Sequence, residues 1–160
     1  MINIQKATRD DIAPLVPLFV EMDEHYLSHE AADAQTLRER LSDWFTQNEN
    51  SCLLVALKKD KALGLATLSP LFPAGSAQTA LFLKELYVSK AKRGMGIGTK
   101  LLRACAAQAH AIGASRLDLT AEANNPQARC FYERLGAFDT AKTYLRWEPD
   151  GIQRLAAGQD

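Results

Sequence analysis

The glycine-rich segment Arg93–Gly98 constrains the fold of this chain more than any other feature of its sequence. Three glycines alternate there with other residues, between an apolar run at 80–89 and an amphipathic stretch at 96–112. Glycine permits positive φ angles and a close approach of the main chain to a ligand. A strand that turns sharply into a helix presents unpaired N–H groups and the positive end of the helix dipole. The segment therefore predicts a strand–turn–helix unit that can bind a phosphate or a pyrophosphate.

Two well-known phosphate-binding patterns do not fit this segment. A Walker motif has Lys followed by Ser or Thr after its last glycine, whereas Gly98 is followed by Thr99 and Lys100 in the reverse order. A dinucleotide fingerprint has the spacing G-x-G-x-x-G at the start of a parallel βαβ unit. The spacing here is G-x-G-x-G, and a predicted hairpin precedes it. A purely structural turn between strand and helix remains the alternative to an anion site.

The periodicity of apolar residues predicts a mixed α+β protein with an antiparallel first half. Strands are predicted at 2–6, 52–57, 63–71, 80–89, 117–122 and 143–147. Helices are predicted at 8–27, 34–47, 96–112, 126–135 and 152–157. Asn125 and Pro126 are typical of a helix start, with Asn as the cap and Pro in the first turn. The length and the lack of a linker indicate a single domain over residues 1–160.

Composition and charge disfavour several classes of protein. The formal net charge is zero at pH 7, without the basic excess of a nucleic-acid-binding protein. No stretch approaches the roughly 20 apolar residues of a membrane span, and the N-terminus has no apolar signal core. We therefore expect a cytoplasmic protein with no nucleic-acid or membrane partner.

The cysteines and histidines give no pattern of a metal site. Cys52, Cys105 and Cys130 stand in apolar contexts without paired spacing, which favours reduced core thiols over a disulfide framework. His25 and His29 are four residues apart but have no further ligand in pattern. We expect no bound metal.

Two segments taken together resemble the GNAT family of N-acetyltransferases. Leu81–Val88 followed by Arg93–Gly98 resembles the central strand and the R/Q-x-x-G-x-G/A motif of that family. Asn125–Gly136 resembles its second motif, N-x-x-A-x-x-F-Y-E-x-L-G. The resemblance is strong over 80–138 and extends over the chain through the predicted order of elements. It implies a mostly antiparallel central sheet, helices on both faces, and a splayed central strand pair.

The same resemblance implies acetyl-CoA as co-substrate and assigns residues to it. The main chain of three strand residues would bind the pantetheine arm: Leu86, Tyr87 and Val88. Amides of the turn would hold the pyrophosphate: Arg93, Gly94, Met95, Gly96, Ile97, Gly98 and Thr99. Asn125 would reach the pantetheine, while Ala128 and Phe131 would line its thiol end.

Direct acetyl transfer to an amine requires a base for the amine and an acid for the leaving thiolate. Tyr132 matches the usual acid position of the family, and a phenol with a pKa near 10 is protonated at neutral pH. Glu85 and Glu122 are the candidate bases, since each is expected at a strand position near the cleft. The alternatives are a buried packing role for Tyr132 and solvated strand-end charges for the two glutamates.

The acceptor is less constrained than the donor. Within the family the chain looks closest to the spermidine/spermine acetyltransferase group, but Lys84 stands where that group has an acid. The segment Met22–Ala34 is acidic enough to attract a cationic amine or is a solvated helix face. We expect the primary amine of a small molecule as acceptor. A protein lysine or N-terminus, and a non-catalytic acyl-CoA-binding module, are the alternatives. The resemblance also implies a homodimer with the C-terminal segment as contact.

Overall fold

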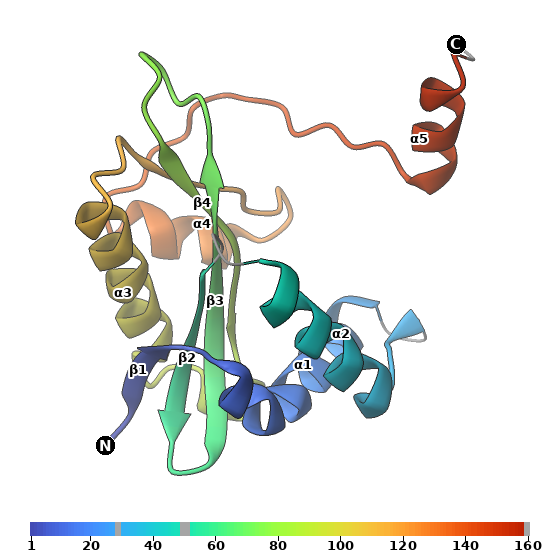
Figure 1. Ribbon diagram of the computed structural model, residues 1–160. Helices are drawn as coiled ribbons and strands as arrows, with labels where there is room; N and C mark the ends of the chain where they lie inside the picture. Colours follow the sequence, from blue (N-terminus) through green and yellow to red (C-terminus); the bar gives the residue numbers. More distant parts are fainter. Residues whose placement is uncertain (28–29, 49–51, 159–160) are drawn as a thin grey trace. The chain divides into compact units, whose positions relative to one another are not determined.

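The computed structural model describes residues 1–27, 30–48 and 52–158 and is drawn in Figure 1. The chain forms two compact units, Met1–Thr120 and Ala121–Asp160, called here the sheet unit and the C-terminal unit. The expectation of one domain over residues 1–160 stays a prediction. His29, one of the two histidines considered for a metal, lies outside the described residues.

Most predicted elements are present in the structure. The sheet unit contains β1 (Asn3–Lys6), η1 (Arg9–Asp11), α1 (Ile12–Leu27), α2 (Ala34–Gln47), β2 (Cys52–Lys58), β3 (Lys61–Leu71), β4 (Ala80–Val88), η3 (Lys90–Lys92), α3 (Ile97–Ala111) and β5 (Leu117–Leu119). The C-terminal unit contains α4 (Pro126–Glu133) and α5 (Pro149–Ala156).

The strands of the sheet unit form one mixed sheet in the order β1-β2-β3-β4-β5. The first three pairings are antiparallel and β4 pairs with β5 in parallel. Helices α1 and α2 cover one face of this sheet and α3 covers the other (Figure 1). The predicted fold class, a mostly antiparallel sheet flanked by helices on both faces, is confirmed.

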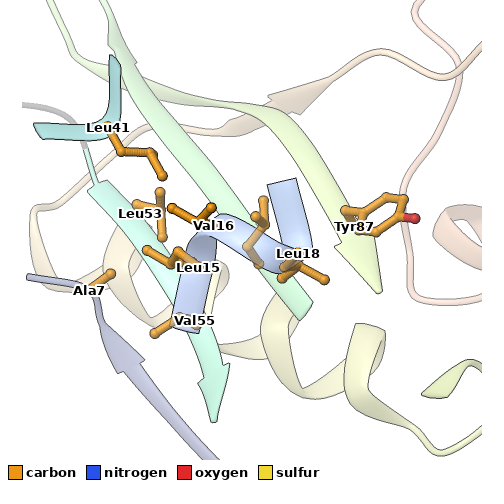
Figure 2. Packing of buried hydrophobic residues seen from close by; sticks show 9 residues of the cluster. Ala7, Leu15, Val16, Leu18, Leu41, Leu53, Val55 and Tyr87 are labelled. Atoms are coloured by element: carbon orange, nitrogen blue, oxygen red, sulfur yellow. The ribbon is translucent and has the colours of Figure 1, made fainter. Parts of the chain in front are cut away.

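The larger part of the core lies between α1 and the sheet. Leu15, Val16 and Leu18 of α1 are each at most 3% exposed and pack on apolar side chains of β2 and β3 (Figure 2). Tyr87 of β4 belongs to the same cluster and is only 1% exposed. Burial of this apolar surface fixes α1 against β4, so polar side chains at the end of α1 have a defined position relative to that strand.

Gly64 of β3 allows α3 to pack closely on the opposite face. A Cβ atom at this position would lie 2.8 Å from the carbonyl oxygen of Tyr87 and 3.1 Å from Cδ1 of Leu101. Because such contacts are closer than van der Waals packing permits, a larger residue would displace the sheet or the helix. The absence of a side chain at Gly64 therefore keeps the first turns of α3 against the sheet.

Strand β5 accompanies β4 for only part of its length. The two strands pair from Leu81–Leu117 to Leu83–Leu119. Beyond that point Glu85–Val88 pair with β3 on one side and with no described strand on the other. The register between β3 and β4 shifts where Lys84 is inserted as an extra residue, and such a bulge bends a strand and increases its twist. The pairing of β4 with β5 is therefore confined to the first part of β4, as expected for a splayed central strand pair.

Two expectations for the later part of the chain are wrong. Strand β5 ends at Leu119, so Glu122 does not end a strand and instead lies in a turn, where its carbonyl accepts the N–H of Asn125 at 2.9 Å. Residues 143–147 form no strand. Their alternating side chains provide two faces, but a strand also needs a main-chain partner, and none of the described residues pairs with them.

Candidate functional site

The glycine turn (Arg93–Thr99) forms an open concave surface at the start of α3. Gly94 and Gly96 have φ angles of 77° and 74°, a conformation that glycine adopts without strain. A Cβ atom at either glycine would meet no other described residue within 4 Å, apart from its chain neighbours. The space above these two residues is therefore open to a ligand.

Several N–H groups of this turn are available for an anion. The first main-chain bond of α3 runs from the N–H of Lys100 to the oxygen of Gly96 at 3.1 Å. The N–H groups of Ile97, Gly98 and Thr99 precede that bond and have no partner within the helix. Together with the positive end of the helix dipole they suit a phosphate or pyrophosphate.

Arg93 supplies positive charge next to the turn. Its Nε donates to the carbonyl oxygen of Val88 at 3.1 Å, and its guanidinium lies 5.6 Å from the ring centre of Tyr87. Lys90 and Lys92 precede it in η3. These cations raise the local attraction for an anion.

The main chain of Leu86, Tyr87 and Val88 lies in the stretch of β4 that β5 no longer accompanies. An extended ligand rich in amide groups can bind such an edge in the way that an added strand does. This open edge runs directly into the glycine turn through Ser89–Lys92. The strand edge that can bind an extended amide ligand is thus followed in sequence by the turn that can bind an anion.

A cluster of polar and aromatic side chains joins the end of α1 to β4. The hydroxyl of Tyr26 donates to Oε1 of Glu85 at 3.2 Å. The rings of His25, Tyr26 and Tyr87 lie between 4.9 and 6.2 Å from one another, centre to centre. Of the two candidate bases, Glu85 is therefore the one placed in a defined polar cluster.

The environment of Glu85 changes its acidity. Burial raises the pKa of its carboxyl above the ordinary value, against the opposing effect of the hydrogen bond from Tyr26. Burial together with the nearby Glu85 raises the pKa of Tyr26 to about 12, so its phenol remains a donor at neutral pH. A carboxyl with a raised pKa is a better base for an amine than an ordinary exposed glutamate.

Sequence reasoning missed Glu21 and the specific role of Tyr26. From the sequence, Glu21 and Tyr26 stand only next to or within the acidic segment Met22–Ala34, with no role of their own. In the structure Oε1 of Glu21 accepts the N–H of Lys90 at 2.7 Å and the hydroxyl of Tyr87 at 3.2 Å. The spacing of Glu21 and His25, one helical turn apart, is the signal that these side chains share a face of α1.

The remaining predicted site residues belong to the C-terminal unit. Asn125 caps α4, since its Oδ1 accepts the N–H of Ala128 at 3.0 Å; its amide nitrogen remains a donor for a ligand. Phe131 and Tyr132 are half-buried and their rings lie 5.1 Å apart. Glu122 is exposed. The structure thus places Glu85 and the glycine turn in the sheet unit. It places Asn125, Ala128, Phe131 and Tyr132 at or on α4 in the C-terminal unit.

Three further observations concern metal ligands, cysteines and membrane-spanning helices. Among the described residues, no group of three or more His, Cys, Asp or Glu side chains could hold a metal ion. Cys105 is buried and Cys52 partly buried, but Cys130 is exposed on α4, so the expectation of a core position is wrong for that thiol. No helix in the described part of the chain is long and apolar enough to span a membrane.

Comparison with known proteins gives matches over most of the chain. The acetyltransferase (GNAT) family profile matches residues 18–137. A Bacillus subtilis (strain 168) protein, the uncharacterized N-acetyltransferase YhfO, is 33% identical over 138 residues, which cover 84% of this chain and 88% of that protein. An integron cassette protein from the mobile metagenome of V. cholerae is 35% identical, with a TM-score of 0.90 and 97% of each chain covered. A probable acetyltransferase of known structure is 25% identical, with a TM-score of 0.79 over 92% of this chain and 97% of that one.

Proposed function

This chain belongs to the acetyltransferase (GNAT) family and is an acyltransferase, and we propose that it transfers an acetyl group from acetyl-CoA to the primary amine of a small molecule. One observation carries the proposal: the open edge of β4 at Leu86–Val88 leads directly into the glycine turn. Coenzyme A presents an extended amide arm followed by a pyrophosphate. The order of these two groups matches the order of the edge and the turn along the chain.

The main-chain groups of β4 and of the glycine turn suit the two polar parts of acetyl-CoA, its amide arm and its pyrophosphate. Leu86, Tyr87 and Val88 would bind the pantetheine arm through their main chain. The amides of the glycine turn would bind the pyrophosphate, with Arg93 as a neighbouring cation. The family profile spans 18–137 and includes residues of both units, which supports assigning Asn125, with Ala128 and Phe131, to the same ligand.

The proposed chemistry divides two proton transfers between two residues. Acetyl-CoA supplies a thioester whose carbonyl carbon the neutral amine attacks. Glu85, directly or through a water, takes the proton of the amine, and its raised pKa suits this role. A main-chain N–H of Tyr87 or Val88 would polarise the thioester carbonyl. Tyr132 would donate its phenolic proton to the departing thiolate.

Glu122 is the second candidate base. It is exposed and lies in a turn rather than in a strand, so it lacks the partial burial that makes Glu85 a stronger base. We therefore place Glu85 first. Matched substitutions of Glu85 and Glu122 by Gln separate the two, because only the base should be needed for turnover at a saturating amine concentration.

The proposed acceptor is a small amine rather than a polyamine. Lys84 is exposed next to Glu85 and contributes a positive charge at that carboxylate. A polycation site needs several carboxylates, and a neighbouring ammonium group opposes it. A protein lysine or an N-terminus remains the second candidate acceptor.

A panel assay tests the function directly. The release of free CoA from acetyl-CoA is measured with monoamines, polyamines and lysine-containing peptides, and CoA binding is measured separately by calorimetry. We expect CoA binding and turnover with at least one small monoamine. Turnover with peptides alone would support the protein-directed alternative, and CoA binding without any turnover would support a non-catalytic acyl-CoA-binding module.

We also propose that the protein is a homodimer with the C-terminal segment as contact. The family resemblance motivates this, and α5 carries the exposed apolar side chains Ile152 and Leu155 one turn apart. Light scattering after size exclusion should give the mass of two chains. A Leu155→Asp variant should reduce that mass, whereas Gln153→Asp on the same helix should not; a single-chain mass for the wild type at all concentrations would contradict the proposal.

A further inference from the structure

Glu21 of α1 accepts hydrogen bonds from Tyr87 and Lys90, which lie on either side of the connection between β4 and η3 at Ser89. Its Oε1 accepts the main-chain N–H of Lys90 at 2.7 Å and the hydroxyl of Tyr87 at 3.2 Å. The same hydroxyl lies 3.4 Å from the carbonyl oxygen of Glu21. Because Tyr87 is only 1% exposed and belongs to the core cluster, these hydrogen bonds anchor the segment to the buried core.

Main-chain hydrogen bonds connect Lys90 and its neighbour Ser89 with the first residues of the approach to the glycine turn. The N–H of Arg93 donates to the carbonyl of Lys90 at 3.4 Å, and the N–H of Lys92 donates to the carbonyl of Ser89 at 2.8 Å. Gly94 follows Arg93 directly. On its other side the segment is held by the N–H of Ser89, which donates to Leu63 of β3 at 3.0 Å. The approach to the turn thus has one anchor in the sheet and one in α1.

The charge of Glu21 argues against a role in attracting the anion. Burial raises the pKa of its carboxyl, but hydrogen bonds from the Lys90 N–H and from the Ser89 and Tyr87 hydroxyls outweigh burial, so the net pKa is lowered. The group is therefore an anion at neutral pH. An anion next to a pyrophosphate site repels the ligand, so we attribute a favourable effect of Glu21 on binding to the hydrogen bonds that it accepts.

We propose that Glu21 is a positioning residue for the acetyl-CoA site: it holds Lys90 and Tyr87 through its carboxylate oxygen and thereby sets the glycine turn in its binding geometry, without contacting the ligand. This inference rests on the proposed function, because it assumes that the turn binds the pyrophosphate of CoA. It assigns to α1 a part in cofactor binding that sequence reasoning gave only to β4, the turn and α4.

Two substitutions of Glu21 separate geometry from charge. Glu21→Gln keeps an oxygen that can accept both hydrogen bonds but removes the charge, whereas Glu21→Ala removes both. CoA affinity measured by calorimetry should fall about five- to tenfold in Glu21→Ala, as expected for the loss of one or two hydrogen bonds. In Glu21→Gln the affinity should equal that of the wild type or exceed it, since a repulsive charge is removed. In turnover the KM for acetyl-CoA should follow the CoA affinity, while kcat and the KM for the amine stay unchanged.

Control variants keep the test decisive. Glu39→Ala removes the same group from an exposed position of α2 and should leave CoA affinity unchanged. Tyr87→Phe removes one of the hydrogen-bond donors to Glu21 and should give a smaller loss than Glu21→Ala; it carries the test if Glu21→Ala does not fold.

The outcomes separate this inference from the proposed function. Equal losses in Glu21→Gln and Glu21→Ala would overturn the positioning role, because charge would then matter more than hydrogen-bond geometry. Unchanged affinity in Glu21→Ala would overturn it as well. A wild-type protein that does not bind CoA would refute the proposed function and the inference together.

Discussion

The hydroxyl of Tyr26, at the C-terminal end of α1, donates a hydrogen bond of 3.2 Å to the carboxylate of Glu85 in β4. The bond directs one carboxylate oxygen of Glu85 toward α1 and stabilises the ionised form of this group. Burial of Glu85 acts in the opposite direction and dominates, so the pKa of the carboxyl is raised. Tyr26 therefore holds the pKa of Glu85 lower than burial alone would set it.

Glu85→Gln should abolish most of the turnover while CoA binding is retained. If Glu85 is the base, its loss should reduce kcat by roughly 10²- to 10⁴-fold, the usual contribution of a positioned proton acceptor. The CoA affinity of this variant, measured by calorimetry, serves as the control for folding. Glu122→Gln should stay within a few-fold of wild type, and the reverse ranking of the two variants would assign the base to Glu122.

Tyr26→Phe should move the acidic limb of the pH–rate profile to higher pH. Activity requires ionised Glu85, so the rate rises as pH increases through the pKa of this carboxyl. Removing the phenol removes a hydrogen bond that lowers that pKa, and the carboxylate is then formed only at higher pH. The profile of kcat/KM is measured with one amine of fixed pKa, so that ionisation of the acceptor is common to both enzymes. A limb at the same pH in both enzymes would show that Tyr26 does not act on the base.

Tyr132→Phe should lower kcat by about 10²-fold or more if the phenol is the general acid. The ring remains to pack against Phe131, and thermal unfolding of the variant serves as the control for stability. Measuring kcat with acceptors of similar size but different pKa checks that the loss is common to all of them. Full activity in this variant would reduce Tyr132 to a packing role.

Gly96→Ala and Gly113→Ala form a matched pair at the two ends of α3. Both glycines have positive φ angles, and a Cβ atom at either position would meet no other described residue within 4 Å, apart from its chain neighbours. Each substitution should therefore destabilise the protein by a similar amount, about 1–2 kcal/mol. Only Gly96→Ala should also weaken CoA binding, because only this glycine lies in the turn. Equal CoA affinities in the two variants would place the pyrophosphate site elsewhere.

Gly64→Ala should destabilise the protein and weaken CoA binding together. The added Cβ would lie 2.8 Å from the carbonyl oxygen of Tyr87 and 3.1 Å from Leu101, so α3 or β4 must shift. Overpacking of this kind costs about 1–3 kcal/mol, which thermal or denaturant unfolding can measure. A variant as stable as wild type would show that α3 does not depend on the close approach at Gly64.

Local signals account for the elements that the sequence predicted well. Helix α2 has the predicted bounds, since Asp33 caps it by accepting the N–H of Thr36 at 2.8 Å and one face is apolar. Asn125 and Pro126 begin α4 as predicted. The glycine turn follows β4 and opens α3 as predicted, and its glycines permit the positive φ angles found at Gly94 and Gly96. Each of these features depends on residues a few positions apart.

Long-range pairings account for the expectations that were wrong or incomplete. The alternation at 143–147 has the period of a strand, but no described strand pairs with it, and periodicity carries no information on a partner. Strand β5 ends at Leu119 and pairs only with Leu81–Leu83 of β4, an extent that the alternation at 117–122 does not define. The prediction that Glu122 ends a strand is therefore wrong, because Glu122 lies beyond β5 in the turn before α4.

The sequence by itself determined the family resemblance, the order of most elements and the glycine turn, because capping, turn chemistry and apolar periodicity act within a few residues. Only the tertiary structure decided which side chains of α1 meet β4. Tyr26 and Glu85 are 59 positions apart, and Glu21 and Tyr87 are 66 positions apart. Contacts at such separations follow from how α1 packs on the sheet around Leu15, Val16 and Leu18, which is a property of the whole core.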